Sequence, residues 1–308
     1  MIIAGTISAA IAALLIWLIW TIGAKSQQPR LRENNVLPEG AYETITFENG
    51  GSVLQGWLLH PAVYSVTDNL ERNDPAEKPA KQPLVIVAHG WGSNRSRVLR
   101  YTKPLLEAGF TVFMYDARSH GDSDPIKAPS ALMFRADIEA AVAVVRTLPD
   151  IDSNRIAVLG HSLGGFGTVL AIGRGLPVRA VVTDSMPIRF ETMLKAELKR
   201  KNIPFFPLGY LIPAIWLLRA GISRDEYKEA QIPLVLTANE EGRQVPMLMI
   251  HAKEDPYIPC GDLRELALQG RVDALFVEGN GHSQSEQDPA FWGRVIPFLT
   301  EKLAKAQA

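Results

Sequence analysis

One stretch of sequence decides the fold: IAVLGHSLGGFGTVLAI, residues 156–172. Its first four residues are apolar and predict a buried strand, and residues 166–172 predict a helix. Between them stands Gly160-His161-Ser162-Leu163-Gly164, a G-x-S-x-G motif. Between a strand and a helix, this motif places the serine on a strained turn with its hydroxyl above the sheet, and the glycines allow close backbone approach. We therefore predict that Ser162 is a nucleophile rather than part of a structural Gly-Ser turn.

Short apolar runs continue to alternate with helical stretches on both sides of the motif. The predicted strands cover residues 84–88, 111–115, 156–159, 180–182, 245–250 and 274–277, and the predicted helices cover residues 98–108, 132–148, 166–172 and 291–303. Strands that are apolar on both faces and alternate with helices are typical of a mostly parallel sheet with helices on both faces, so we predict an α/β fold. Residues 42–47 and 52–59 flank Asn49-Gly50-Gly51, a hairpin signal, and residues 63–82 predict a surface loop.

A serine is a weak nucleophile at its ordinary pKa and needs a base and an orienting carboxylate. Of the six histidines, His282 lies in a loop after the last predicted strand, so we predict that it is the base rather than a solvated loop histidine. In this type of site the acid lies between the serine and the histidine in chain order. Asp255 follows the penultimate strand and is the predicted acid, the alternative being a turn cap. Its rivals are Asp184, Glu254 and Asp262.

Two backbone amides are predicted to stabilise a developing oxyanion. The Leu163 amide stands at the start of the predicted helix, where the helix N-terminus adds positive potential. The second amide is expected after the first parallel strand, in His89-Gly90-Trp91-Gly92, and we assign it to Trp91. Gly90 lets that loop turn tightly, and His89 is expected to form hydrogen bonds within the loop and not to act as a second base.

Taken together, these motifs resemble those of the α/β-hydrolase superfamily. The resemblance rests on the G-x-S-x-G motif, residues 89–92, the loop DARSHGDS at residues 116–123, Asp255 and His282, and it runs from about Tyr42 to Leu303. It looks closest to the membrane-anchored bacterial branch related to dienelactone hydrolases and serine aminopeptidase-like enzymes. In such relatives the loop commonly reads D-x-R-G-H-G-x-S, and here Ser119 stands in place of the first glycine. The resemblance implies an α/β-hydrolase fold without cofactor or metal.

Composition excludes several classes of protein. The chain has 308 residues, is 47% hydrophobic, and carries 32 basic against 33 acidic side chains. Such a chain is not disordered and has no basic footprint for nucleic acid, so we expect no nucleic-acid partner. The single cysteine, Cys260, excludes an internal disulfide framework and a multi-thiolate metal site.

The N-terminal segment is predicted to be a membrane anchor. Residues 1–24 carry no charged side chain, and about 20 apolar residues are enough to span the roughly 30 Å hydrocarbon core. Trp17 and Trp20 lie near the end of the segment, where interfacial aromatic residues are found. We predict an anchor over residues 1–24, a tether over residues 25–40, and an α/β-hydrolase domain over residues 41–308.

A cleaved signal peptide is the alternative for this segment. No Lys or Arg precedes the apolar run, and Ile22 departs from the A-x-A cleavage pattern, so we favour a retained anchor. Lys25, Arg30 and Arg32 follow the run, and the positive-inside rule therefore predicts a cytoplasmic catalytic domain.

Residues 186–232 are too long for a simple crossover and lie where the resembling family inserts caps or lids. Within this segment, residues 205–218 carry no charge and have basic flanks. Two interpretations stay open: a buried helix in the cover of the sheet, or a mobile lid that docks on a bilayer and admits an apolar acyl chain. Prolines at 204, 207 and 213 exclude a second spanning helix.

We therefore predict a membrane-anchored serine hydrolase that cleaves a carboxylic ester or related acyl bond in a small-molecule or lipid-like substrate. A serine peptidase, an aminopeptidase-like enzyme or a thioesterase is the alternative within this class. Acidic residues of the cap would suit an aminopeptidase that binds a free amine: Glu191, Glu197, Asp225, Glu226 and Glu229. A non-catalytic, membrane-bound binding protein of the same fold is the alternative from another class.

Overall fold

The computed structural model describes residues 2–62, 81–242 and 244–305, so most of the loop predicted at residues 63–82 lies outside the described residues. Eight strands form one sheet in the order β1-β2-β4-β3-β5-β6-β7-β8. The strands are β1 (Tyr42–Asn49), β2 (Ser52–Leu59), β3 (Gln82–Ala88), β4 (Thr111–Tyr115), β5 (Ile151–His161), β6 (Ala180–Asp184), β7 (Met247–Ala252) and β8 (Asp273–Val277). From β4 to β8 all neighbouring strands are parallel, which confirms the predicted mostly parallel sheet.

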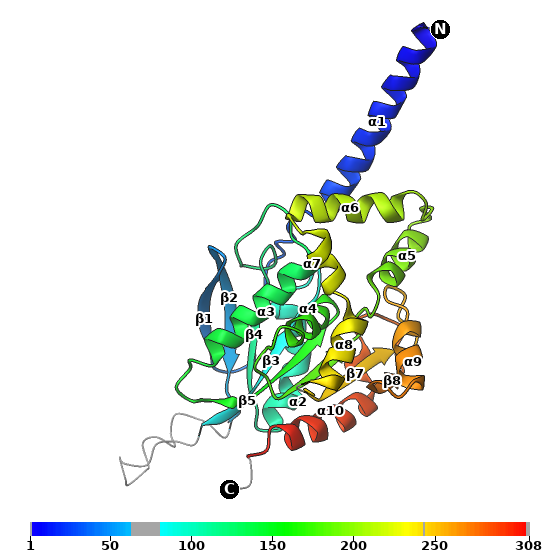
Figure 1. Ribbon diagram of the computed structural model, residues 1–308. Helices are drawn as coiled ribbons and strands as arrows, with labels where there is room; N and C mark the ends of the chain where they lie inside the picture. The colour runs from blue at the N-terminus through cyan, green and yellow to red at the C-terminus, as the bar shows by residue number, and fades with distance from the viewer. Residues whose placement is uncertain (1, 63–80, 243, 306–308) are drawn as a thin grey trace, which may run out of the picture.

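Strands β3, β4 and β6 are largely apolar because both faces of the sheet are covered there. In β3, Leu84, Ile86 and Ala88 join the hydrophobic core on one face, whereas Val85 and Val87 join the core on the other. This alternation follows from the two-residue period of a strand. Helices α3 (Ala131–Val145), α4 (Leu163–Ile172), α8 (Ile232–Glu241) and α9 (Gly261–Leu268) contribute to the first core. Helices α2 (Thr102–Glu107) and α10 (Pro289–Lys302) contribute to the second, as Figure 1 displays.

Differences from the predicted elements have local causes. The helix predicted at residues 98–108 divides into a 3₁₀ segment, η3 (Arg95–Tyr101), and the short α2. Helices α8 and α9 have no counterpart among the predicted elements, because each buries only two or three side chains and so carries a weak apolar pattern. The hairpin is confirmed: Asn49 pairs with Ser52, and Gly50 and Gly51 both adopt positive φ.

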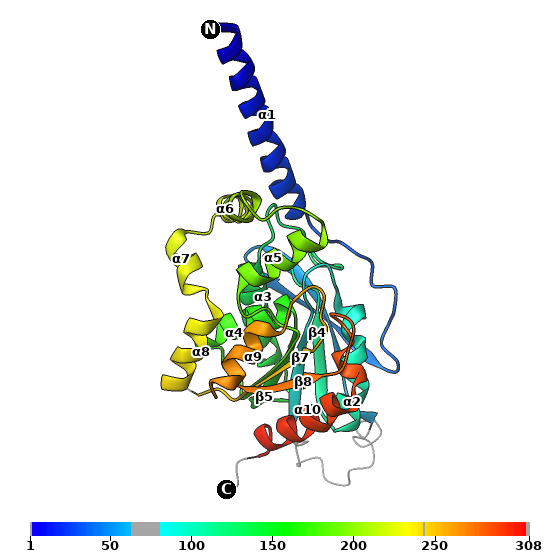
Figure 2. The same ribbon diagram turned by 90° about the vertical axis from the view of Figure 1, so that its right-hand side faces the viewer.

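The segment between β6 and β7 contains three further helices at the carboxyl edge of the sheet. They are α5 (Phe190–Arg200), α6 (Leu208–Ala220) and α7 (Arg224–Glu229). In α6 only Gly209 and Ile212 are buried, so the interpretation of residues 205–218 as a buried helix in the cover of the sheet is wrong. Helix α6 lies across the end of the molecule opposite the C-terminus, at the foot of the N-terminal helix α1 (Ile2–Ser26) (Figures 1 and 2).

Residues 25–40, predicted as a tether, are held against the domain. Helix α1 continues to Ser26, and the following residues run over the loops after β3 and β4. The Arg30 amide donates to the Ser119 carbonyl at 2.6 Å, and the Asn94 side chain donates to the carbonyls of Arg32 and Glu33 at 3.1 and 3.0 Å. The path of the segment is therefore fixed by polar contacts with the domain.

Candidate active site

Ser162 lies on a strained turn between β5 and α4. Its φ of 53° is in the left-handed region, which non-glycine residues rarely adopt, and such strain is concentrated at functional sites. The turn is tight because the flanking glycines lack side chains: a Cβ on Gly164 would lie 2.3 Å from the Ala88 carbonyl oxygen. The Ser162 amide donates to the Asp184 carbonyl at 2.9 Å, which fixes the turn to the end of β6. The serine therefore has the geometry expected of a nucleophile on a strand-to-helix turn.

His282 and Asp255 are brought together at the same edge of the sheet. Nδ1 of His282 lies 2.6 Å from Oδ2 of Asp255, so the carboxylate accepts the Nδ1 proton and leaves Nε2 as the ring nitrogen that can receive a proton. Asp255 lies in the loop after β7, and its Oδ1 accepts hydrogen bonds from the amides of Tyr257 and Ile258 at 2.8 and 3.0 Å. The pair thus has the orientation of a base held by an acid.

The environment of Asp255 keeps it ionised. Burial alone would raise its pKa, but the contacts with His251 and His282 and the hydrogen bond from the Ile258 amide outweigh burial and hold the pKa well below its ordinary value. A carboxylate that stays charged can stabilise the imidazolium that forms when His282 takes up a proton.

The rival carboxylates have other partners. Asp184 is buried, accepts the Tyr101 hydroxyl at 2.5 Å, and accepts the Ser185 hydroxyl at 3.0 Å. Asp262 pairs with Arg189 at 2.9 Å. Glu254 is exposed. Among the four candidates, Asp255 is therefore the one that the structure joins to His282.

The loop after β3 lies directly against the serine. A Cβ on Gly90 would lie 2.7 Å from Cβ and 3.1 Å from Oγ of Ser162, so this backbone approaches the hydroxyl as closely as glycine permits. The next residue, Trp91, is half-buried, and its ring packs against the ring of His120. Its amide and that of Leu163, the first residue of α4, remain the two predicted oxyanion donors.

His89 supports this loop in the way its sequence position predicts. Its Nδ1 donates to the Gly90 carbonyl at 2.8 Å, and its Nε2 accepts the Ala117 amide at 2.9 Å, so both ring nitrogens are used. Burial lowers the pKa of His89 to about 4, which keeps the ring neutral near pH 7. A neutral ring with no free nitrogen is a support for the loop and not a base.

Sequence reasoning missed the contact that His161 makes. This residue occupies the second position of the G-x-S-x-G motif, and its Nε2 donates to the backbone carbonyl of His282 at 2.7 Å. The two rings lie 4.8 Å apart. Burial, followed by the nearby Arg100, holds the pKa of His161 well below its ordinary value, so the ring is a neutral donor. The G-x-S-x-G motif therefore positions Ser162 and, through His161, also the backbone at His282.

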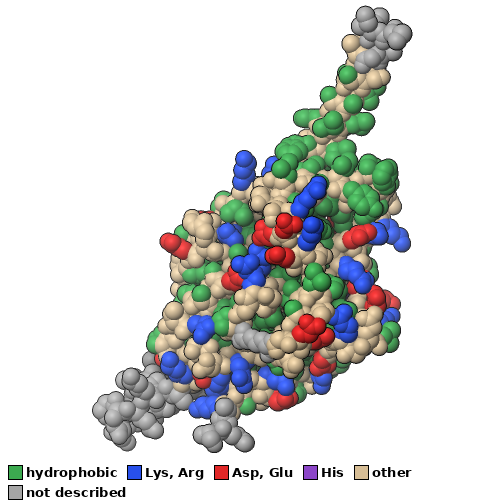
Figure 3. Space-filling model, viewed as in Figure 1, with side chains coloured by type: hydrophobic (Ala, Val, Ile, Leu, Met, Phe, Trp, Pro, Cys, Tyr) green, Lys and Arg blue, Asp and Glu red, His purple; other side chains and the backbone are tan. Residues whose placement is uncertain are grey.

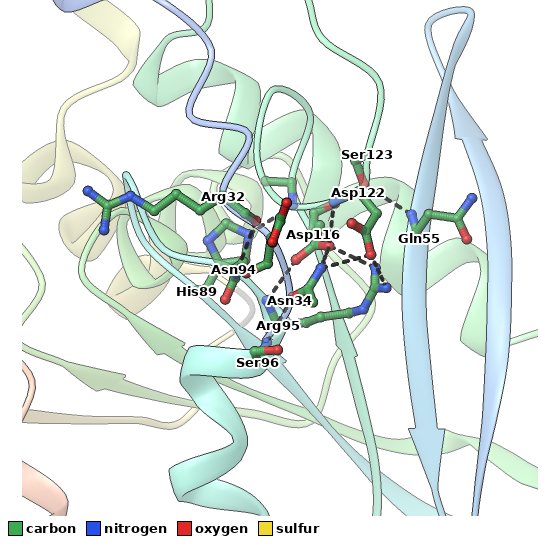
Figure 4. Close-up of polar contacts among 12 residues, drawn as sticks. Arg32, Asn34, Gln55, His89, Asn94, Arg95, Ser96, Asp116, Asp122 and Ser123 are labelled. Carbon is green, nitrogen blue, oxygen red and sulfur yellow. Dashed lines mark hydrogen bonds and ion pairs between the residues drawn. The ribbon is translucent and has the colours of Figure 1, made fainter. Parts of the chain in front are cut away.

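A second missed feature joins the N-terminal segment to the loops behind the site (Figure 4). The buried Asp116 accepts the amide and the guanidinium of Arg95, each at 2.7 Å. The Asn34 side chain donates to Asp116 at 2.8 Å and to Asp122 at 2.9 Å. A Cβ on Gly121 would lie 2.1 Å from Asp116, which explains the glycine at this position. These contacts fix the loop after β4, and that loop supports His89 through the Ala117 amide.

In the described parts of the chain no group of three or more His, Cys, Asp or Glu side chains could hold a metal ion. The expected independence from a cofactor stays a prediction.

This sheet, with a serine turn after β5 and an acid–histidine pair at its carboxyl edge, defines an α/β hydrolase. The model of the alpha/beta hydrolase family matches residues 85–292, well over half of the sequence, and the chain belongs to this family.

The chain is also similar to curated proteins and to solved structures. The chain is 29% identical over 221 residues to the uncharacterized protein YfhR of Escherichia coli K12, a match that covers 70% of this chain and 64% of YfhR. It is 26% identical to the uncharacterized protein Rv2307c of Mycobacterium tuberculosis, covering 98% of this chain and 95% of that one. Its fold is similar to that of the Pyrococcus furiosus esterase Pf2001, with a TM-score of 0.62, 20% identity, and coverage of 90% and 100%.

Proposed function

We propose that this protein is a membrane-anchored serine hydrolase that cleaves a carboxylic ester or related acyl bond through an acyl-enzyme. Ser162 is the nucleophile, His282 the general base and acid, and Asp255 the orienting carboxylate. The amides of Trp91 and Leu163 stabilise the oxyanion. The observation that carries the proposal is the 2.6 Å contact between His282 Nδ1 and Asp255 Oδ2, together with the left-handed conformation of Ser162 on the turn after β5.

The reaction follows from these positions. Oγ of Ser162 attacks the substrate carbonyl carbon while Nε2 of His282 takes the hydroxyl proton, and the carbonyl oxygen becomes the oxyanion. When the tetrahedral intermediate collapses, His282 gives that proton to the leaving group and Ser162 carries the acyl group. Water then attacks the acyl carbon, His282 takes a proton from the water, and the acid is released as Ser162 regains its proton.

An ester is favoured over the free amine of an aminopeptidase substrate by the ion pairs of the cap. Glu191 pairs with Lys195 at 2.8 Å, and Glu226 pairs with Arg135 at 2.9 Å. Glu197 pairs with Arg200 at 2.8 Å, and Asp225 pairs with Lys228 at 3.3 Å. Four of the five acidic side chains considered for amine binding thus already have basic partners. The esterase named among the fold neighbours agrees with this preference.

Retention of α1 as an anchor is supported by its contacts with the domain. The apolar part, Thr6–Ser26, has 21 residues, which corresponds to about 30 Å of helix. Its last turn is bound by α6: the Trp216 indole donates to the Gly23 carbonyl at 3.1 Å and to the Ser26 hydroxyl at 2.7 Å. We place the domain in the cytoplasm because Lys25, Arg30 and Arg32 follow the apolar run of residues 1–24. Activity of a C-terminal periplasmic reporter, with a silent cytoplasmic reporter, would reverse this orientation.

A fluorophosphonate probe tests the chemistry. We expect the full-length protein in detergent to form one adduct, located on Ser162 by mass spectrometry and absent from Ser162→Ala and His282→Ala. Ser153→Ala is the matched control, because Ser153 lies near the start of β5, far along the strand from the site. Absence of any adduct on correctly folded protein would instead favour a non-catalytic binding protein. If Ser162 forms the adduct, fresh unlabelled protein would then be assayed with ester, thioester and peptide panels.

A further inference from the structure

We propose that α6 is a second membrane contact: its exposed apolar side chains rest in the interfacial layer of the bilayer that α1 spans. The contact would hold the carboxyl edge of the sheet, where Ser162 lies, toward the lipid. This inference rests on the proposed anchoring by α1 and extends it from a single attachment to a fixed orientation of the domain.

The first observation is an exposed apolar stripe along α6. Phe206, just before the helix, is 76% exposed, Tyr210 is 63% exposed and Leu218 is 71% exposed. Ala214, also exposed, completes a spacing of four residues, which places these side chains along one side of the helix. We call Phe206, Tyr210, Ala214 and Leu218 the α6 stripe. Large apolar side chains gathered in this way on a surface mark an interaction site.

The second observation is that α6 is joined to the foot of α1. Besides the bonds from Trp216, the Ile215 side chain lies against Gly23 so closely that a Cβ there would come within 2.9 Å of it. Arg219 donates to the Gln27 side chain at 3.0 Å. Helix α6 therefore lies where the spanning helix leaves the bilayer, and Figure 3 shows hydrophobic side chains gathered in this part of the surface.

The orientation and length of α6 fit a surface helix. Figures 1 and 2 show α6 lying across the direction of α1, so it runs along the membrane plane if α1 crosses the membrane. Its 13 residues correspond to about 20 Å, too short for the roughly 30 Å hydrocarbon core. An apolar helix too short to span can rest at the foot of an anchor in the interfacial layer, where Tyr and Trp side chains are enriched.

Two further contacts at the foot of α1 orient the catalytic edge. Gln27 donates to the Pro129 carbonyl at 3.4 Å, and Arg219 donates to the Lys127 carbonyl at 3.3 Å. Both carbonyls belong to the segment after β4, at the carboxyl edge of the sheet where Ser162, Asp255 and His282 also lie. The edge with the candidate site therefore faces the end of the molecule from which α1 extends.

Charge favours lipid over a second copy of this chain as the occupant. Exposed basic side chains lie at the foot of α1 and on both sides of α6 in the chain: Lys25, Lys199 before α6 and Arg224 after it. Anionic headgroups attract such side chains near the surface. Two copies that met through this face would instead bring the same basic residues together.

Spin labels on the full-length protein in phosphatidylcholine–phosphatidylglycerol vesicles test the proposal. Cys260→Ser removes the native thiol, and Leu218→Cys or Tyr210→Cys carries the nitroxide. Leu268→Cys on α9 is the matched control, because Leu268 is 85% exposed and remote from α1. We expect labels at 210 and 218 to be relaxed strongly by oxygen, which concentrates in lipid, and weakly by a water-soluble nickel chelate. The oxygen-to-nickel ratio should be several-fold higher than at position 268.

Each other outcome overturns the inference. Strong relaxation by nickel at 210 and 218, equal to that at 268, means that the stripe faces water. Weak relaxation by both reagents means a protein contact, such as a second copy. If the protein does not float with the vesicles, the anchor and the α6 contact fail together. The readout needs no substrate, so a failed fluorophosphonate test would overturn the hydrolase proposal and leave this one standing.

Discussion

Replacing Gly90 by alanine places one methyl group against the candidate nucleophile. Its Cβ would lie 2.7 Å from Cβ of Ser162, whereas ordinary van der Waals contact begins at 3.4 Å, so the loop or the serine must move by about 0.7 Å. Misplacement by about 1 Å at a reacting group can cost about 10² in rate. We therefore expect kcat for a p-nitrophenyl ester to fall by about 10², which corresponds to about 2.7 kcal/mol of transition-state stabilisation.

Two measurements separate this effect from general damage. Gly261→Ala is the matched control, because a Cβ there meets nothing within 4 Å and should leave kcat unchanged. Thermal unfolding of Gly90→Ala reports any loss of stability, since overpacking in a buried site costs about 1–3 kcal/mol. Wild-type kcat in a folded Gly90→Ala protein would refute the reasoning that this loop borders the reacting groups.

Three further predictions concern Asp255, the buried His89 and the N-terminal segment at Asn34. Asp255→Asn should lower kcat by about 10⁴ in the ester assay while circular dichroism stays native, because an amide facing Nδ1 favours the wrong tautomer; a drop under tenfold would contradict the role of the acid. Burial lowers the pKa of His89 in the folded protein to about 4, whereas a histidine of the unfolded chain has a pKa of about 6.5. Between these two pH values the unfolded chain binds a proton at His89 and the folded chain does not. The free energy of unfolding in urea should therefore decrease from pH 7 to pH 5, by about 2 kcal/mol for His89 alone, and a flat profile would contradict this prediction. Asn34→Ala should speed tryptic cleavage after Arg32 relative to Asn35→Ala, whose exposed side chain has no described partner; equal rates would show that Asn34 does not hold the segment.

The sheet and the serine turn could be predicted because their signals are local. Apolar runs of strand length report burial on both faces, and the G-x-S-x-G motif lies within one turn of chain. At Ser119, which departs from the glycine of related loops, the chain adopts a positive φ. Ser119 adopts a φ of 64°, and its hydroxyl accepts the Ile126 amide at 2.8 Å, so the local hydrogen bond supports a left-handed serine.

Other features could not be predicted because they depend on residues distant in sequence. Asp184 ends one parallel strand and Asp255 follows another, and only the neighbour in space distinguishes them: Tyr101 for Asp184 and His282 for Asp255. The contact of Asn34 with Asp116 joins residues 82 positions apart, so no local pattern reports it. The hydrogen bond from His161 to the backbone of His282 spans 121 positions and is equally hidden.

The contact between α1 and α6 also constrains the order of events during synthesis. Trp216 and Gly23 are 193 positions apart in the chain. At about 5–20 residues per second, a ribosome needs roughly 10–40 s to make the chain between them. Throughout that interval the nascent N-terminal helix has no α6 to receive it, so an anchor of the kind proposed above begins its targeting before the indole that binds its last turn exists.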